Sequence, residues 1–335
     1  MIIKILARKA LPRVESFVEH PWWPAVVLAL AAFMHPAFAR SPREFHRTLS
    51  VTPNDPVTLD VHLSEGQLEI AYGRSEEVSI AAISLSAGAK TDKAFVADLA
   101  IQQDGNKLRI RNPRSAETRA QQVGIVCKID VPYQTEVNSV VDRGKQTITG
   151  IMGPVKASTD VGDIKVAYVS KGALVEAGAG NLALEVIGEH VQAKTGDGNI
   201  SCIRAFQGAS AETGAGDIVL MVVGPSTAIV KNGTGRIDVG GARGHFRGST
   251  SRGDLHIKAM PHDNWWLNSA SGNIRVELPP RARFDVDAAT KAGEILVDRV
   301  DIQRSNAEIH SLYQKVNGGG KRVELRTDSG KIVIR

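Results

Sequence analysis

The sequence predicts an all-β protein, a parallel β-solenoid with coils of about 18 residues that hold two strands each, preceded by an N-terminal β cap. One observation is a glycine that returns at a nearly constant spacing. The second is an alternation of apolar and polar residues on both sides of that glycine, which is typical of strands with one buried face. The third is a composition rich in glycine, with 32 residues, and poor in aromatics, at 5%.

The glycine repeat defines the coil. From Gly144 to Gly272 a glycine, usually followed by Asp or Asn and then by Ile or Leu, recurs every 18 or 19 residues, and the interval lengthens before Gly293 and before the final copy at Gly330. Glycine adopts backbone angles that other residues avoid, so we assign it to a turn. The structural turn glycines are Gly66, Gly144, Gly162, Gly180, Gly198, Gly216, Gly235, Gly253, Gly272, Gly293 and Gly330.

Two strands flank each of these glycines. The second and fourth residues after the glycine are apolar, as with Ile218 and Leu220 after Gly216, and the residue between them is mostly mixed or polar. Small or apolar residues lie seven and five positions before it. A Thr, such as Thr213, often lies three positions before it, where it can hydrogen-bond a neighbouring coil. One such unit cannot bury its apolar face alone, but stacked copies can, with equivalent residues about 4.8 Å apart.

The regularity of the repeat suggests the domain boundaries. Residues 40–143 alternate with less regular spacing and form an N-terminal β-region that caps the solenoid, and residues 144–335 form the repeats. Residues 299–320 interrupt the period, so we expect an insertion there, with a short helix around 306–316. Residues 322–335 repeat the pattern once more and are expected to close the last coil.

Residues 1–39 are typical of a secretory signal peptide. A basic start is followed by the apolar run Ala25–Met34 and by the small-x-small site Ala37–Ala39. The run is short for a membrane span, although an uncleaved N-terminal anchor is the alternative. We therefore expect an exported protein in the periplasm or at the cell surface of a bacterium, with membrane contact only through an uncleaved N-terminal segment.

The charge distribution limits the classes of partner that we expect, and the cysteine content limits the possible disulfides. The net charge is +5, but no dense Lys/Arg block is present, so nucleic acid is not an expected partner. Cys127 and Cys202 are the only cysteines. Two buried thiols in strands are the favoured interpretation, and a disulfide in an exported protein is the alternative.

Four segments resemble a known family, the bacterial putative-adhesin family, whose domain has no established function. They are RTLSVTPNDPVTLDVHLSEGQLEIAYGRSEEVSI, KIDVPYQTEV, VELPPRARFDV and NGGGKRVELRTDSGKIVIR. The resemblance covers most of residues 45–335. It implies a right-handed β-solenoid in an exported or envelope protein, and it brings no catalytic residues.

No cofactor and no metal site is expected. Calcium-binding RTX repeats have a period of nine and an aspartate where this chain has Leu or Ile. An enzyme acting on polysaccharide is the alternative class, because Asp142 and Asp160 should stack one rung apart and glycosidases use paired carboxylates. No third partner for this pair is apparent, and the histidines show no metal spacing.

The favoured function is therefore a non-enzymatic, exported solenoid, an adhesin or envelope module whose repetitive surface binds an unknown envelope protein or glycan. A membrane-anchored envelope-stress or signalling module is a further alternative. The candidate interaction surface consists of Ile203, Val219 and Met221, which point outward on adjacent rungs and should touch, with Trp266 as a separate candidate for sugar stacking. An exposed apolar patch is covered either by the chain or by a partner. We favour covering by residues 299–320 or by the N-terminal strands.

Overall fold

The computed structural model describes residues 44–74, 76–84, 99–112, 124–222, 227–299, 302 and 310–335. All of them belong to one compact unit, Pro42–Arg335, and every element in it is a β-strand. The interpretation of residues 1–39 as a signal peptide lies outside the described residues. Within the described part, no helix has the length and hydropathy needed to cross a membrane.

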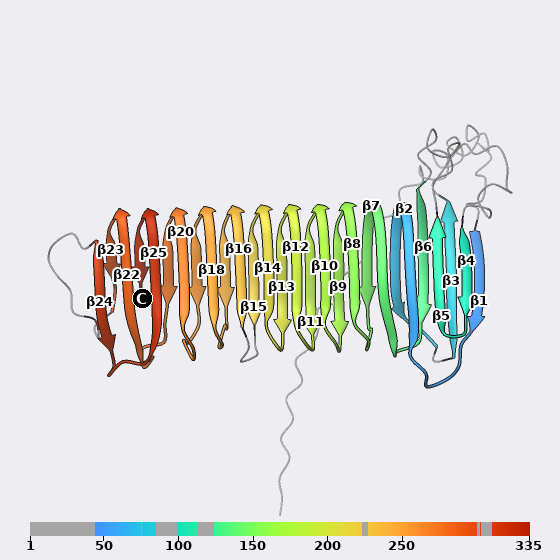
Figure 1. Ribbon diagram of the computed structural model, residues 1–335, viewed down its shortest axis with the longest axis horizontal. Helices are drawn as coiled ribbons and strands as arrows, with labels where there is room; N and C mark the ends of the chain where they lie inside the picture. The colour runs from blue at the N-terminus through green and yellow to red at the C-terminus, as the bar shows by residue number, and fades with distance from the viewer. Residues whose placement is uncertain are drawn as a thin grey trace, which may run out of the picture. The chain divides into compact units, whose positions relative to one another are not determined.

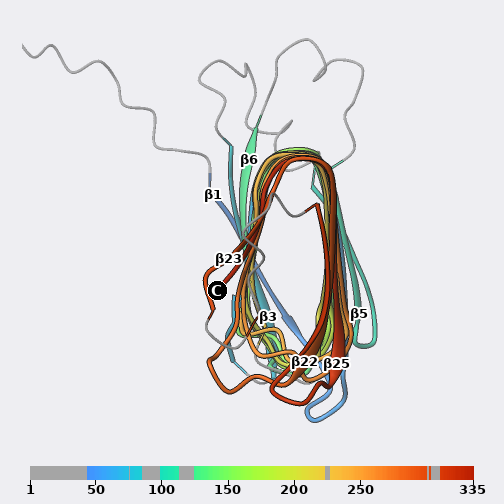
Figure 2. The same cartoon turned by 90° about the vertical axis from the view of Figure 1, so that its left-hand side faces the viewer.

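Each central coil places one strand on each of two faces, as Figures 1 and 2 show. The first-face strands are β8 (Val155–Val161), β10 (Ala173–Ala179), β12 (Val191–Asp197), β14 (Ala209–Ala215), β16 (Ala228–Thr234), β18 (Phe246–Arg252) and β20 (Trp265–Ser271). The second-face strands are β9 (Ile164–Val169), β11 (Leu182–Ile187), β13 (Ile200–Ala205), β15 (Ile218–Val222), β17 (Ile237–Gly240), β19 (Leu255–Lys258) and β21 (Ile274–Glu277).

Equivalent residues of successive coils pair in parallel. Val175, for example, lies between Ala157 and Ala193, and Leu184 lies between Val166 and Cys202. The prediction of a parallel β-solenoid is thereby confirmed. The regular glycine spacing produces it, because a constant coil length returns every side chain to the same face and the same height relative to its neighbours.

The core is a set of stacked columns between the two faces. Ile164, Leu182, Ile200 and Ile218 form one such column, and each is at most 1% exposed. Cys127 and Cys202 occupy inward positions as free, buried thiols, which confirms the favoured interpretation. Burial raises the pKa of each thiol to about 12, because the thiolate would lose its hydration there.

A polar column lies beside the turn glycines. Thr213 donates to the carbonyl oxygen of Gly198 at 2.9 Å, and Thr195 donates to that of Gly180 at 3.1 Å. The expected hydrogen bond between a Thr and the neighbouring rung is confirmed. It satisfies carbonyl groups that the turns would otherwise leave unpaired in a buried place.

At the N-terminal end two long strands run through both faces. β2 (Val57–Tyr72) and β7 (Thr135–Thr149) pair in parallel along their length, and Gly66 lies opposite Gly144. β5 (Lys107–Asn112) and β6 (Ile125–Val131) lie on the other side of β2. The outermost strands are antiparallel: β4 (Ala100–Asp104) on β5, β3 (Glu77–Ser84) on β6, and β1 (Glu44–Ser50) on β3.

The C-terminal coil departs from the expected order. β25 (Lys321–Ser329) lies between β20 and β22 (Phe284–Ala292), and β26 (Ile332–Ile334) lies between β21 and β23 (Ile295–Val297). The expectation that residues 322–335 close the stack is therefore wrong, since this coil is inserted one place before the end. The edge strand is β24 (Ser311–Val316), which is antiparallel to β22.

The short helix expected around 306–316 is also corrected. Residues 311–316 form β24, and residues 303–309 lie outside the described residues. The alternation in Ser-Leu-Tyr-Gln-Lys-Val suits a strand, and pairing with β22 decides the conformation because it satisfies the open edge of the sheet.

Candidate functional site

The eleven turn glycines lie in one column at a corner of the coils. A Cβ added to any of them would lie 1.7–2.2 Å from a carbonyl oxygen of the neighbouring rung. At Gly198, for example, the oxygen belongs to Gly180 at 2.1 Å, and the φ of Gly198 is +138°. No side chain fits there, so this column fixes how closely the turns stack. Phosphate or metal ligation does not explain it.

The Asp/Asn residues that follow the glycines form a ladder. The side-chain oxygen of Asn181 accepts a hydrogen bond from the backbone N–H of Asn199 at 3.0 Å, and that of Asn199 accepts one from Asp217 at 2.7 Å. In the same way, the side-chain oxygen of Asp163 accepts a hydrogen bond from the backbone N–H of Asn181. These oxygens are thus used to pair turn backbone. In the described residues no group of three His, Cys, Asp or Glu side chains could hold a metal ion.

The predicted apolar patch is on the second face. Ile203 on β13 lies opposite Met221 on β15, and Val219 precedes Met221 on the same strand, two positions earlier. Their exposed fractions are 38%, 45% and 39% in that order. The favoured idea that the chain covers this patch is therefore wrong, because about two fifths of each residue remains exposed.

Trp266 lies on the other face, on β20. The guanidinium of Arg247 stacks over its ring at 4.7 Å from the centroid, and Glu324 lies beside it on the next rung. The indole is only partly exposed. One ring face is thus occupied by a cation, which leaves less aromatic surface for a sugar than the sequence suggested.

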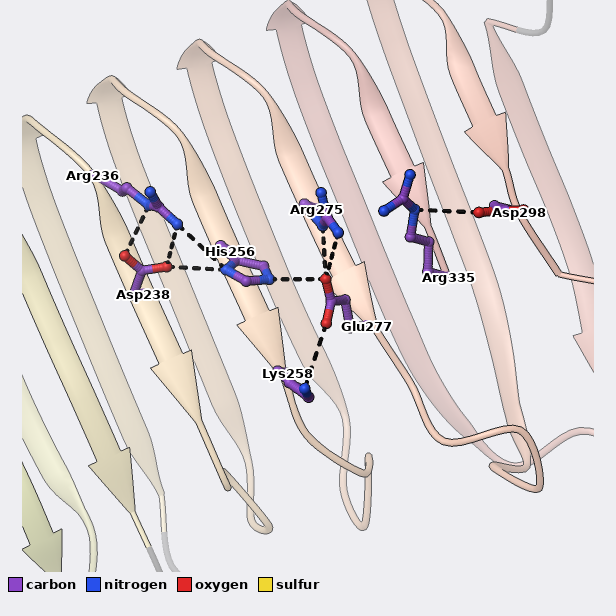
Figure 3. A network of polar contacts seen from close by, with 8 residues as sticks. All are labelled: Arg236, Asp238, His256, Lys258, Arg275, Glu277, Asp298 and Arg335. Atoms are coloured by element: carbon purple, nitrogen blue, oxygen red, sulfur yellow. Dashed lines mark hydrogen bonds and ion pairs between the residues drawn. The ribbon is translucent and has the colours of Figure 1, made fainter.

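A network of charged side chains follows the outer surface of β17, β19 and β21 (Figure 3). We call it the polar ladder, and its members are Arg236, Asp238, His256, Lys258, Arg275 and Glu277. His256 lies at its centre, with Nδ1 3.0 Å from Asp238 Oδ1 and Nε2 3.3 Å from Glu277 Oε1. The parallel register causes this, since it places residues 238, 256 and 275 opposite one another.

Glu277 is the most strongly held carboxylate of the polar ladder. Arg275 donates to its Oε1 through Nε at 2.8 Å and approaches it through Nη2 at 2.7 Å. These contacts, with a smaller contribution from His256, hold the pKa of Glu277 below its usual range. Glu277 is therefore charged at neutral pH. Lys258 Nζ is farther away, at 3.9 Å.

A cavity of about 570 Å³ adjoins the C-terminal end of the polar ladder. Its charged lining comes from Lys258, Arg275, Glu277 and Arg335, and its apolar lining from Ala259, Met260, Leu278, Pro279 and Pro280. The coil that begins at Gly272 is longer than those before it, since the next turn glycine is Gly293, and it includes the two prolines. The cavity is thus a local consequence of an irregular repeat.

A buried arginine holds the proline segment in place. Arg299 is 7% exposed and donates through Nη1 to the carbonyl oxygens of Leu278 at 2.9 Å and Pro279 at 3.3 Å. Its Nη2 donates to Pro280 at 3.3 Å, and its guanidinium lies 5.6 Å from the centre of the Phe284 ring. One side chain therefore fixes three consecutive carbonyl groups behind the cavity wall.

Carboxylates also line a second cavity of about 450 Å³ at the N-terminal end, which includes Asp60, Asp104 and Glu136. Asp60 is bound by Arg111 through both guanidinium nitrogens, with Nη1 at 3.0 Å. Such a charge-neutralised carboxylate makes a poor general acid. Asp142, the other acidic candidate, contacts His62 Nε2 at 2.9 Å.

Sequence reasoning missed both histidine contacts. It considered the histidines for metal spacing, yet His256 follows Asp238 by 18 residues and contacts it. The repeat alignment that defines the inward columns also aligns these outward residues, and it could have found the pair. His62 and Asp142 are 80 residues apart and become neighbours only because β2 pairs with β7.

Comparison with known protein families identifies the family to which the chain belongs. The family model for the Toastrack DUF4097 domain matches residues 57–335. The chain belongs to the Toastrack DUF4097 family. This confirms the resemblance that its segments suggested. No curated protein matches the chain.

Several solved structures are similar, each at low identity. A putative cell adhesion protein from Clostridium sporogenes is 13% identical, covers 87% of this chain and 98% of its own, and has a TM-score of 0.25. A putative lipid binding protein from Parabacteroides distasonis is 14% identical, with 70% and 96% covered and a TM-score of 0.40. A putative adhesin from Bacteroides fragilis is 10% identical, with 87% and 97% covered and a TM-score of 0.29. At these scores the likenesses carry no argument about function for this Toastrack protein.

Proposed function

We propose that this protein is an exported, non-enzymatic binding module of the bacterial envelope, and that the apolar patch of Ile203, Val219 and Met221 is its main contact surface. The observation that carries the proposal is the exposure of this patch on three positions of two adjacent rungs. Neighbouring exposed apolar side chains favour association, because a partner removes them from water.

The setting of the patch supports a macromolecular partner. The second face is a row of parallel strands at a spacing of about 4.8 Å, so its outward side chains form an extended, regular surface. Val219 lies between the polar residues Ser201 and Asp238, and Ile203 lies between Met221 and Glu185. An apolar centre with a polar rim is the usual anatomy of an interface.

An enzyme acting on polysaccharide is the second candidate, favoured by the carboxylates of the second cavity, about 450 Å³ in volume. The contacts of Asp60 argue against it, since Arg111 and Arg109 hold this carboxylate as a charged partner. An assay for reducing ends on envelope polysaccharides separates the two classes. Release of reducing ends that is lost in Glu136→Gln would overturn the non-enzymatic proposal.

Binding is tested with Met221→Lys and a matched control, Leu296→Lys. Leu296 is an apolar residue of the same face and is 42% exposed, but it lies on β23, near the C-terminal end of the stack. Binding of the purified proteins to a glycan array and to isolated envelope fractions would be measured. We expect Met221→Lys to weaken binding about tenfold, equivalent to about 1.4 kcal/mol, and Leu296→Lys to leave it unchanged. Unchanged binding for both variants would contradict the proposal.

A further inference from the structure

We infer that the cavity of about 570 Å³ at the end of the polar ladder is a binding site for a sugar acid, a ligand with a carboxylate and an apolar ring face. The inference deepens the proposed binding function, on which it rests, but uses other residues. The cavity is lined from β19, β21 and the segments after β21 and β26, whereas the apolar patch lies on β13 and β15. Failure of one site therefore leaves the other testable.

The charges of the cavity favour an anion. Three cations, Lys258, Arg275 and Arg335, line it together with the carboxylate of Glu277. The negative charge of Glu277 is already matched by Arg275, whose two nitrogens lie 2.7 and 2.8 Å from Oε1. Arg335 is paired with Asp298 at 3.4 Å, so Lys258 is the lining cation with the longest contact to a carboxylate of the protein and the one that a ligand carboxylate would meet.

Lys258 is the cation best placed to meet a ligand. Its side chain is 76% exposed, and its amine lies 3.9 Å from Glu277 Oε2, beyond hydrogen-bond distance. Arg335 is a second cation of the lining, and its Nε forms an ion pair with Asp298 at 3.4 Å. Figure 3 shows Lys258 beside the Glu277 carboxylate and Arg335 on the next strand along, next to Asp298.

Part of the cavity wall is apolar for a structural reason. Pro279 and Pro280 have no backbone N–H, and their carbonyl oxygens accept hydrogen bonds from Arg299 on the buried side. Ala282 N donates to Pro279 O at 2.9 Å and Asn317 Nδ2 to Pro280 O at 3.2 Å. The prolines therefore present mainly C–H surface to the cavity, and neighbouring apolar side chains extend it.

Arg299 acts as a positioning residue for this wall. Its hydrogen bonds to three consecutive carbonyl groups hold the proline segment rigid, and rigid walls lower the entropy cost of binding.

The combination selects the ligand class. The cations of the lining recognise a carboxylate, and its apolar wall packs against the C–H face of a pyranose ring. The volume lies in the range of small-molecule sites, about 300–1,000 Å³. A neutral sugar would lack the charge, and a simple anion such as acetate would leave the apolar wall uncovered.

The test uses the full chain and titration calorimetry with defined probes: galacturonic acid, a galacturonate trimer, a neutral cello-oligosaccharide and acetate. We expect binding of the two acidic sugars, weakened as salt rises because exposed charges are screened. Binding of the trimer alone would support recognition of the acid within a polymer, and equal binding per site would support recognition of the single unit. Binding of neither acidic sugar, or equal binding of the neutral oligosaccharide or of acetate, would overturn the inference.

Two lysine variants sharpen the result. Lys258→Gln should weaken galacturonate binding at least fivefold, whereas Lys291→Gln should not change it. Lys291 is a matched control because its side chain is 78% exposed and it pairs with Asp328, away from the cavity lining. Equal affinity of Lys258→Gln and wild type would overturn the inference. Met221→Lys should keep galacturonate binding, which separates this site from the apolar patch.

Discussion

The two turn edges of the solenoid are built on different principles. At the glycine edge, each turn holds one of the eleven glycines and its Asp, Asn or other corner residue, and the same contacts recur from coil to coil. At the opposite edge the turns vary in length and composition. That edge carries exposed Tyr168, Phe206 and Met260, and the cavity opens beside it.

Backbone conformation shows the same contrast. Tyr168, Val186 and Arg204 occupy equivalent places near the ends of β9, β11 and β13, next to the opposite edge, and all have φ between 56° and 62°. Non-glycine residues, and a β-branched valine above all, are disfavoured there. These three positions accommodate a Cβ and tolerate strain, whereas the glycine edge has no such room. The glycine edge therefore maintains the repeat, and the opposite edge is free to carry specific chemistry.

The largest expected effect is at the glycine edge. Gly198→Ala would place a Cβ 2.1 Å from the carbonyl oxygen of Gly180, where only backbone movement could relieve the clash. We expect a loss of about 4 kcal/mol in the free energy of unfolding, measured by chemical denaturation. Gly105→Ala is the control, because a Cβ there meets nothing within 4 Å. A similar loss in both variants would refute the steric explanation.

A smaller effect is expected in the threonine column beside that edge. Thr213→Val removes the hydrogen bond to Gly198 O and should cost about 1 kcal/mol. Thr250 lies in the same column, but its buried Oγ1 has no hydrogen-bond partner among the described residues. Thr250→Val should therefore be neutral or stabilising in the same denaturation experiment, and an equal loss in both variants would contradict this interpretation of the column.

At the opposite edge we expect a substitution that increases the stability of the protein. Val186→Asn relieves a β-branched residue with a φ of 56°, and asparagine tolerates this region far better. We expect a gain of about 1 kcal/mol, seen as a higher midpoint of thermal unfolding. A lower midpoint would mean that packing of the valine side chain outweighs its backbone strain.

No effect is expected from chelation. The corner oxygens of Asn181 and Asn199 already accept backbone hydrogen bonds, so the turns have no need of a cation. The thermal midpoint in EDTA should equal that in calcium. A clear decrease in EDTA would show that the Asp/Asn ladder binds a metal.

Sequence periodicity predicts the parts of the fold in which pairing is local. Ile218 could be placed in the core and Met221 at the surface because their neighbours lie one period away. The pairing of Gly66 with Gly144 and the place of β25 could not be predicted, because the intervening segments break the period and nothing local specifies the partner. The contact of His256 with Asp238 could have been predicted from the same repeat alignment, because the two residues are 18 positions apart.

The candidate cavity depends on residues outside the repeat. Its wall comes from Leu278, Pro279 and Pro280 in a coil of irregular length, and the anchor Arg299 comes from the segment expected to be an insertion. A buried arginine bonded to carbonyl groups leaves no periodic signal. Only the three-dimensional arrangement joins these residues to Lys258 on β19.

The insertion of β25 between β20 and β22 has a consequence for assembly. Lys331 donates its backbone N–H to Asn273, 58 residues earlier, so neighbouring coils are not consecutive in synthesis. A solenoid that winds from one end could proceed coil by coil as the chain emerges. Here β22 pairs with β25 and not with β20, so it joins the stack only after β25 has paired with β20. Closing so long a loop slows folding. We therefore expect the C-terminal coils to remain open to proteases and chaperones after the central coils have formed, and to close in a single late step.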